Sequence, residues 1–220
     1  MSGSILVTGA GGFIGRHLVA ALQSKGHTVA THSIEDGDIA RDELSFSGIE
    51  HVFHLAGQSF VPESWRDPRR FCETNVLGAI NVIRPAATAM KEGGGGAVVL
   101  IGSQSMFAPQ MPQGGYAASK SALLSAMYYL CDELGPDNIR CNMVIPSWMW
   151  GPPVEMLMNW RSKNEGKTVE EALDDVVGKF PLRRMTEDGE VADVVAFFAS
   201  DHAKAVTGQY LLVNSGEMFR

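Results

Sequence analysis

The stretch that decides the fold is VTGAGGFIG, residues 7–15, because it joins two segments with different hydrophobic patterns. The run before it, SILVTG (4–9), is short and apolar, which is typical of a buried parallel strand. The segment after it, FIGRHLVAALQSKG (13–26), places apolar residues at helical spacing and ends at a glycine. A strand, a glycine-rich turn and a helix therefore open the chain.

Three glycines of this turn, Gly9, Gly12 and Gly15, recur at three-residue intervals. In a strand–turn–helix unit the first permits the tight turn, the second lets backbone amides approach a pyrophosphate, and the third lets helix and strand pack closely. The start of the helix, at Phe13 and Ile14, then faces the phosphates with the positive end of the helix dipole. This context favours a dinucleotide site over a glycine-rich turn without a ligand.

Strands and helices alternate along the rest of the chain, without an internal repeat or a domain linker. This order predicts a parallel sheet covered on both faces, a doubly wound α/β/α arrangement (Rossmann fold) formed by residues 1–220 as one domain. We expect further strands at 27–33, 51–57, 97–103, 139–146 and 208–214, helices at 67–92 (bent at Pro85), 113–135 and 187–200, and a flexible connector at GGGG (93–96).

The connection after the second strand is too short for a complete crossover. A parallel crossover needs a dozen or so residues, usually with a helix. Only a few residues separate Ser33 from the polar stretch GDIARDEL (37–44). We therefore expect a helix and a full edge strand to be missing beside the second strand, which leaves that edge of the sheet irregular.

Composition excludes several classes of protein. The 220 residues carry a net charge of −7, whereas a nucleic-acid-binding protein needs a basic face. No apolar run is long enough for a membrane span, and the N-terminus does not read as a signal peptide. Cys72, Cys131 and Cys141 lack metal-site or redox spacing and the six histidines are scattered, so we expect free thiols and no metal site. The sequence predicts a soluble cytoplasmic protein.

Several segments, taken together, resemble one family. TGAGGFIG (8–15) and HVFHLAG (51–57) resemble the extended, sugar-nucleotide-handling branch of the short-chain dehydrogenases/reductases. YAASK (116–120), IRCNMVIPS (139–147) and residues 181–217 resemble its compact single-domain branch. The resemblance covers nearly the whole chain. It implies an NAD(P)-dependent oxidoreductase that interconverts a carbonyl and a secondary alcohol.

The resemblance implies four catalytic residues, Asn75, Ser103, Tyr116 and Lys120. Tyr116 and Lys120 are four residues apart, which places them on one helix face. The phenol, with an ordinary pKa of about 10, would be the general acid or base, its pKa lowered by the lysine ammonium and an oxidised nicotinamide. Ser103 would hydrogen-bond the substrate oxygen, and Asn75 would hold a water that links Lys120 to solvent.

Each of these residues also has an ordinary structural alternative. Tyr116 could be a half-buried helix side chain, Lys120 a solvated charge, Ser103 a cap at a strand end, and Asn75 a hydrogen-bonding residue at a helix end. Their joint occurrence behind the glycine-rich turn favours the catalytic interpretation.

The adenosine end departs from the family pattern. NAD-dependent members often carry an acidic residue at the end of the second strand, where this chain has Ser33. A serine does not repel a 2′-phosphate, and Arg16 and His32 are available as phosphate partners. Glu35 and Asp36 could instead bind the ribose hydroxyls. On balance the sequence slightly favours NADP(H) over NAD(H).

The family pattern also implies the remaining cofactor contacts. A threonine that commonly contacts the nicotinamide amide falls near Gly151, so that contact is open. The other implied contacts are Asp38 and Ile39 at the adenine, Leu55, Ala56 and Gly57 after the third strand, and Pro146, Ser147 and Met149 after the strand at 139–146.

Two segments are expected to contact the substrate, QSMFAPQMPQ (104–113) and SWMWGPPVEMLMNW (147–160). The tryptophans and methionines of the second indicate either plain core or a mobile apolar lid that excludes water from the nicotinamide. The stretch RSKNEGK (161–167) is expected to be solvated.

Two other functions stay open at this point. A sugar-nucleotide epimerase or dehydratase is suggested by the N-terminal third, although SQSMF (103–107) lacks the acidic pair of the family's dehydratases. A dinucleotide-sensing regulator would bind cofactor without turnover, although such relatives usually lose the tyrosine and lysine.

The helix predicted at 113–135 carries more apolar residues than one face needs to cover a sheet. Compact members of the family usually pair through the helices that correspond to 67–92 and 113–135. We therefore expect a homodimer, or a homotetramer built from such dimers. The apolar residues concerned are Leu123, Leu124, Met127, Tyr128, Leu130, Cys131 and Leu134.

Overall fold

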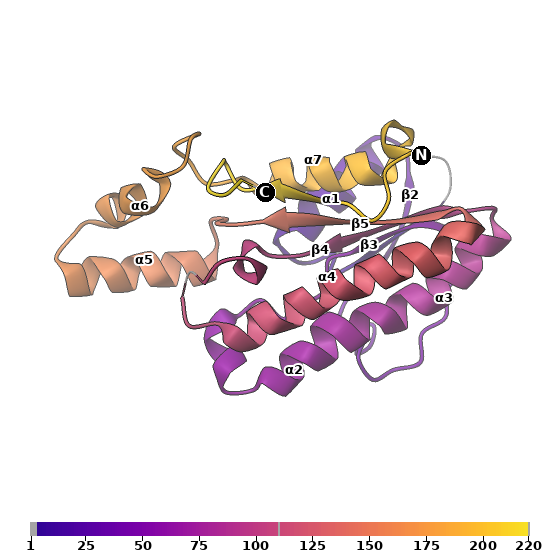
Figure 1. Ribbon diagram of the computed structural model, residues 1–220, viewed down its shortest axis with the longest axis horizontal. Coiled ribbons are helices and arrows are strands. Elements are labelled where there is room, and N and C mark those ends of the chain that lie inside the picture. Colours follow the sequence, from indigo (N-terminus) through magenta and orange to yellow (C-terminus); the bar gives the residue numbers. More distant parts are fainter. Residues whose placement is uncertain (1–3, 110, 220) are drawn as a thin grey trace.

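Six strands form one parallel sheet in the order β2-β1-β3-β4-β5-β6 in the part of the chain that the structure, a computed structural model, describes: residues 4–109 and 111–219 (Figure 1). Every neighbouring pair is parallel and the order runs outward from β1 in both directions, so the predicted doubly wound sheet is confirmed. The strands are β1 (Ser4–Thr8), β2 (Thr28–His32), β3 (Ile49–His54), β4 (Gly96–Ile101), β5 (Ile139–Pro146) and β6 (Tyr210–Val213).

Helices cover both faces of this sheet. Strand β4 shows why a central strand of this sheet is apolar throughout: Val98 and Leu100 join the core on one face, whereas Ala97 and Val99 join the core on the other. One layer consists of α1 (Phe13–Ser24) and α7 (Asp188–Ala199), and the other of α2 (Pro68–Cys72), α3 (Ala79–Glu92) and α4 (Gly114–Leu134) (Figure 1).

Strand β2 is an edge strand, as the short connection after it predicted. Within the described residues it pairs only with β1, and the segment between β2 and β3 contains no helix. This segment is nevertheless fixed to the body. Ile39 is buried in the core beneath α3, and the Asn81 amide donates hydrogen bonds to the carbonyls of Ile39 (3.2 Å) and Ala40 (3.3 Å).

The long helix predicted at 67–92 is divided. A π-helical turn, Glu73–Gly78, separates α2 from α3, whereas α3 continues through Pro85, where the sequence predicted the bend. The GGGG run is not a flexible connector: Gly93 caps α3, and Gly96 is the first residue of β4 and donates to the Asn138 carbonyl (3.1 Å). Strand β3 ends at His54, three residues before the predicted end.

The segment after β5 is where the sequence predicted least well. The sequence analysis interpreted 147–160 as either plain core or a mobile lid and 161–167 as a solvated stretch, and it assigned no helix here. The structure has α5 (Pro152–Glu165) and a turn into α6 (Val169–Val177), which the sequence did not predict. The two helices make a lobe beyond the carboxyl ends of the strands, apart from both helical layers (Figure 1). We call residues 152–177 the α5–α6 lobe.

The apolar excess predicted on α4 is smaller than expected. Of the seven residues concerned, Tyr128 alone is exposed. Leu123, Met127 and Leu130 are buried, and Leu124, Cys131 and Leu134 are partly buried against the same core. No helix within residues 4–109 and 111–219 has the length and apolar character needed to cross a bilayer.

Candidate active site

A cavity of about 1400 Å³ opens along the carboxyl ends of the strands. Open α/β sheets bind ligands at this edge. The volume exceeds the roughly 300–1,000 Å³ of a typical single-ligand pocket, so the cavity has room for two ligands. It is lined by Ser103 and by every residue predicted to contact the cofactor: Gly9, Gly12, Phe13, Ile14, Gly15, Ser33, Asp38, Ile39, Leu55, Ala56, Gly57, Tyr116, Lys120, Pro146, Ser147 and Met149.

The glycine-rich turn is packed too tightly for side chains. Gly9 has a φ of +68°, and a Cβ on it would lie 2.7 Å from the Ala56 nitrogen. A Cβ on Gly15 would lie 2.3 Å from the Gly9 carbonyl oxygen. Gly12 is the N-cap of α1 and has no side chain to satisfy the first amides of the helix. These free amides at the positive end of α1 suit an anionic group such as a pyrophosphate.

At the end of β2, Ser33 is bound to Asp36. The amide and the hydroxyl of Ser33 both donate to Asp36 Oδ2, at 2.8 and 2.9 Å. These hydrogen bonds, the backbone one first, lower the pKa of Asp36 below its usual value, so the carboxylate is charged at neutral pH. The turn after β2 therefore holds a fixed negative charge next to Ser33.

The two residues suggested as phosphate partners are engaged elsewhere. The Arg16 guanidinium lies 3.5 Å from Asp188 at the start of α7. The His32 ring is buried, with its Nε2 3.1 Å from the Gly37 carbonyl oxygen. Arg16 does not line the cavity. His32 does line it, but its Nε2 lies at hydrogen-bond distance from a backbone carbonyl, so neither residue presents a free donor to a phosphate.

Ser103, Tyr116 and Lys120 come together on one wall of the cavity. Ser103 follows β4, and Tyr116 lies in the first turn of α4, one turn before Lys120. Burial raises the pKa of Tyr116, and a hydrogen bond with Ser103 opposes this shift. In the protein alone burial is the larger of these two influences, and the lowering expected from Lys120 together with an oxidised nicotinamide stays a prediction.

Lys120 is not a solvated charge. It is buried, its ammonium donates to the Ile101 carbonyl at 2.8 Å, and burial lowers its pKa from 10.5 to about 8. A lysine that is buried beside a single carbonyl and lines a cavity with a tyrosine is held in a poorly solvated position. Such perturbed groups concentrate at functional sites.

Asn75 lies behind the cavity wall, in the π-helical turn, and does not line the cavity. Its Oδ1 accepts from the Gln58 amide (2.7 Å), and its Nδ2 donates to the Gln58 carbonyl (3.3 Å) and to Ser119 Oγ (2.9 Å). These contacts tie the segment after β3 to α4, next to Lys120. The role of Asn75 in holding a water stays a prediction.

His54 is a residue near the site that the sequence analysis did not single out. Its Nδ1 is 2.9 Å from Thr8 Oγ1, and its Nε2 is buried without a hydrogen-bond partner. Burial, and then the charge of Lys120, lower the pKa of His54 to about 3, so the ring is neutral. It lay within the quoted HVFHLAG segment, but only the fold brings it beside Lys120.

The segment after β5 is held by Glu217, which the sequence analysis also missed. The Ser147 hydroxyl donates to one carboxylate oxygen, and the Trp148 indole donates to the other (3.3 Å). Gly151, where the family has a threonine, adjoins the ring of Phe13: a Cβ at this position would lie 2.8 Å from Phe13 Cζ. The Phe13 ring thus occupies space that a side chain would need.

The two segments predicted to contact the substrate reach the cavity unequally. From 104–113, Met111 and Gln113 line it, whereas Gln104 and Ser105 are buried, and Gln110 lies outside the described residues. From 147–160 ten of the fourteen residues line it, including one face of α5. That segment is therefore a cavity wall and not plain core.

The family model described as enoyl-(acyl carrier protein) reductase matches residues 45–217. The chain belongs to the short-chain dehydrogenase/reductase family. It is an NAD(P)-dependent enzyme of this family. The chain is similar to L-rhamnose 1-dehydrogenase of Azotobacter vinelandii, with 35% identity over 65% of this chain and 53% of that enzyme. It is similar to the (3R)-3-hydroxyacyl-CoA dehydrogenase of Mus musculus, with 28% identity over 96% and 94%. A short chain dehydrogenase structure from Francisella tularensis covers 99% of both chains at 25% identity and a TM-score of 0.84.

Proposed function

We propose that this enzyme interconverts a carbonyl and a secondary alcohol by hydride transfer, with Tyr116 as the general acid or base. One observation carries the proposal. Ser103, Tyr116 and Lys120 share one wall of a cavity that continues to the glycine-rich turn at Gly9–Gly15. A cofactor held by that turn and a substrate held by Ser103 and Tyr116 would lie side by side, which is the arrangement that direct transfer between two ligands requires.

The residues present fit a dinucleotide. The turn offers free helix amides and backbone that a Cβ would obstruct at Gly9 and Gly15, which suits close approach of phosphates. When bound, the nicotinamide would supply a hydride to the carbonyl carbon or accept one from the alcohol.

Each residue of the catalytic wall then has a distinct task. In the reductive direction Tyr116 gives its proton to the carbonyl oxygen, and in the oxidative direction it takes that proton back. Its raised pKa keeps the phenol protonated at neutral pH, as a proton donor must be. Ser103 orients the substrate oxygen beside the phenol. Lys120 stabilises the phenolate left after proton donation, and Asn75 positions the backbone around Lys120.

At the adenosine end we propose NAD(H), in place of the slight preference for NADP(H) drawn from Ser33 alone. A 2′-phosphate needs hydrogen-bond donors, and both donors of Ser33 are taken by Asp36. The charge of Asp36 would also repel the phosphate. Ribose hydroxyls face no such repulsion and can donate to the acceptors of this turn.

The proposal is tested with Tyr116→Phe, which removes the phenol oxygen and keeps the ring. With Tyr128→Phe as the control on the same helix, turnover of a ketone and alcohol panel is followed by absorbance of the reduced nicotinamide. Because general acid–base catalysis contributes about 10²–10⁴-fold, we expect Tyr116→Phe to lower kcat by at least about 10²-fold. The dinucleotide affinity of the variant should stay within a few-fold of that of the parent enzyme. Turnover by Tyr116→Phe equal to that of Tyr128→Phe would reject the mechanism. Dinucleotide binding without any turnover would favour a sensing role.

Two broader expectations are part of the proposal. A cytoplasmic location is supported by Cys72, Cys131 and Cys141, which are all free thiols. A homodimer, or a tetramer of such dimers, is supported by Tyr128 and Tyr129 on the outer side of α4, whose exposed fractions are 46% and 69%. Light scattering at micromolar concentration tests the assembly, and a mass near 23.7 kDa with and without cofactor would reject it.

A further inference from the structure

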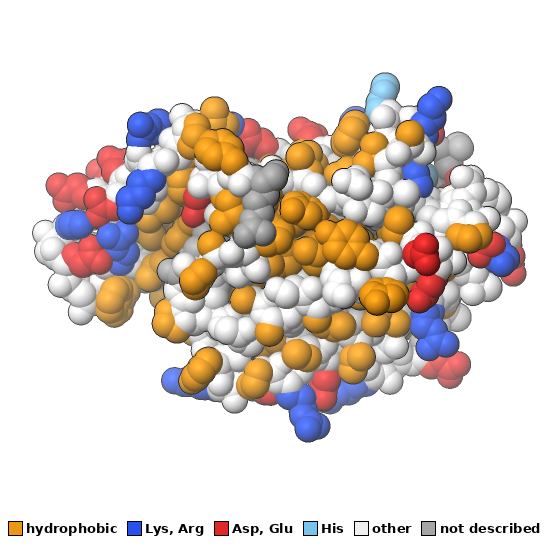
Figure 2. Space-filling model, viewed as in Figure 1, with side chains coloured by type: hydrophobic (Ala, Val, Ile, Leu, Met, Phe, Trp, Pro, Cys, Tyr) orange, Lys and Arg blue, Asp and Glu red, His pale blue; other side chains and the backbone are white. Residues whose placement is uncertain are grey.

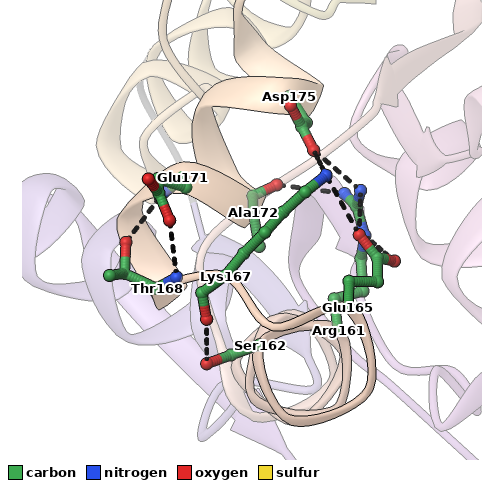
Figure 3. A network of polar contacts seen from close by, with 8 residues as sticks. All are labelled: Arg161, Ser162, Glu165, Lys167, Thr168, Glu171, Ala172 and Asp175. Carbon is green, nitrogen blue, oxygen red and sulfur yellow. Dashed lines mark hydrogen bonds and ion pairs between the residues drawn. The ribbon is translucent and has the colours of Figure 1, made fainter.

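One side of α5 is fixed to α6 by a polar network (Figure 3). Arg161 donates to both carboxylate oxygens of Glu165 (2.9 and 3.0 Å), to Asp175 (3.0 Å) and to the Ala172 carbonyl (3.0 Å). Lys167 donates to the same Asp175 oxygen at 2.6 Å. These contacts set the rotation of α5 about its own axis, because they tie residues of one face to the neighbouring helix.

The other side of α5 carries an apolar stripe. Pro153, Met156, Leu157 and Trp160 follow the i, i+3, i+4, i+7 spacing of a single helix face, and all four line the cavity. We call these four residues the α5 stripe. Met156 and Trp160 are nevertheless 47% and 58% exposed. The stripe has the pattern of a helix face that packs on something apolar, yet it faces the cavity and not a protein core.

Apolar side chains also line the cavity on the body. Val61 and Pro62 come from the segment after β3, and Met111 precedes α4. Trp150, 46% exposed, stands at the base of the lobe. Figure 2 shows hydrophobic side chains where the lobe meets the body and charged side chains over the outside of the lobe. Exposed apolar surface concentrated in a cavity of this kind marks a site for an apolar ligand.

We propose that the substrate is an apolar ketone or secondary alcohol whose hydrocarbon body packs between the α5 stripe and the wall formed by Val61, Pro62 and Met111. The inference rests on the proposed function, since Tyr116 and Ser103 hold the oxygen end. A sugar is the contrasting ligand. Its hydroxyls lose water on binding and need polar partners, which the stripe does not provide.

The proposal predicts how the rate depends on chain length. Each additional methylene that is buried should raise kcat/KM about fourfold, because its burial favours binding of the substrate. Across butan-2-one, hexan-2-one and octan-2-one we therefore expect kcat/KM to rise by roughly one order of magnitude for each pair of methylenes, until the stripe is covered. A hexose should be turned over no better than butan-2-one.

The test compares Trp160→Ala with Trp65→Ala in the full-length protein with cofactor. Trp65 is 77% exposed and does not line the cavity, so it is a matched control for loss of a surface tryptophan. We expect Trp160→Ala to lower kcat/KM for octan-2-one about tenfold, to leave butan-2-one within twofold, and to flatten the chain-length series. Met156→Ser, a second change in the stripe, should act in the same direction. Trp65→Ala should leave the series unchanged.

The outcomes separate this inference from the proposed function. If turnover depends on Tyr116 but is faster with the hexose, or does not change with chain length, the inference of an apolar substrate is wrong. The proposed oxidoreductase function is then still supported. If no compound is turned over, calorimetric titration with octan-2-ol decides the inference alone. Binding that Trp160→Ala weakens about tenfold and Trp65→Ala retains supports it, whereas absence of binding by the parent protein, or equal binding by the two variants, overturns it.

Discussion

The glycine-rich turn and the α5–α6 lobe border the same cavity, yet different forces hold them. At the turn, backbone lies against backbone: any Cβ on Gly15 would overlap the Gly9 carbonyl, and the strand before it is buried from Ile5 to Thr8. In the lobe, the side chains of Arg161, Glu165, Lys167 and Asp175 are 20–44% exposed to solvent, and α5 buries only Met158. Close packing tolerates almost no change in side-chain volume, whereas each exposed ion pair contributes little to the stability of the fold.

Under the proposed function, this contrast would let one fold keep its cofactor wall while its substrate wall varies. The turn is part of the core, so a change there affects both folding and ligand. The lobe is joined to the body through residues 148–151 and 178–186, where Met149 pairs with Thr186 in a short parallel bridge. A change in the lobe therefore affects the ligand with little effect on the sheet.

The sharpest test of the turn is Gly15→Ala. Overpacking of this kind costs about 1–3 kcal/mol, which lowers the Tm of a chain of this size by roughly 3–10 °C, and it displaces the start of α1. We expect dinucleotide binding to be lost as well. Gly11→Ala is the control for stability, because a Cβ at Gly11 has no atom within 4 Å. Calorimetric melting of the two variants checks the prediction, and equal Tm values would show that the turn is not close-packed.

Lys120→Met tests whether the catalytic wall costs stability. The folded-state pKa of Lys120 is about 8 against 10.5 unfolded, so between these values the unfolded chain binds the proton more tightly. Its burial therefore destabilises the enzyme fully below pH 8, and this cost fades as pH rises to 10.5. We expect the variant, although inactive, to be about 1–3 kcal/mol more stable at pH 7 and nearly equal at pH 10.5.

Urea unfolding at pH 7 and pH 10.5 measures this gap for variant and parent in parallel, which cancels the titration of all other groups. A gap that does not change with pH would mean that Lys120 keeps an ordinary pKa in the folded enzyme.

Local patterns predicted the sheet, and the reason is physical. Strands buried on both faces are continuous apolar runs, and Gly9, Gly12 and Gly15 mark a turn that suits a phosphate, so short windows suffice for both. The short connection after Ser33 likewise predicted the bare edge of β2. The family spacing of Ser103, Tyr116 and Lys120 then predicted three residues that do lie together along the cavity.

The lobe was missed although its helix signals were present. Pro152 and Pro153 open α5, Gly166 ends it with a φ of +68°, and Thr168 with Glu171 forms a capping box at the start of α6. The regular spacing of the α5 stripe indicates a helix as well, but the sequence analysis considered its tryptophans and methionines by composition and not by period. Glu217 could not have been found, since its partner Ser147 lies 70 residues away.

Asp36→Asn tests the adenosine end of the cofactor wall, where the fold relies on a charge and not on packing. The amide oxygen of asparagine can still accept from Ser33, so the turn should keep its shape while the charge is removed. We expect the NADP(H) to NAD(H) ratio of kcat/KM to rise about tenfold. Glu43→Gln is the control, because Glu43 is an exposed acid of the same loop and, unlike Asp36, is not the residue that accepts from Ser33. An unchanged ratio in Asp36→Asn would place cofactor choice elsewhere.

The smallest effect is expected from Asp175→Asn, which removes the carboxylate shared by Arg161 and Lys167. Exposed pairs contribute little to stability, so the Tm should fall by only roughly 1–2 °C. The stripe of α5 should nevertheless lose its fixed orientation, and KM for octan-2-one should rise several-fold with kcat for butan-2-one unchanged.

High salt should produce the same rise in KM in the parent enzyme, because it screens exposed ion pairs. Asp174→Asn is the matched control, since the Asp174 side chain is exposed and takes no part in the network. If the two variants behave alike, the network does not orient α5, and the lobe is held by its backbone and by Met158 instead.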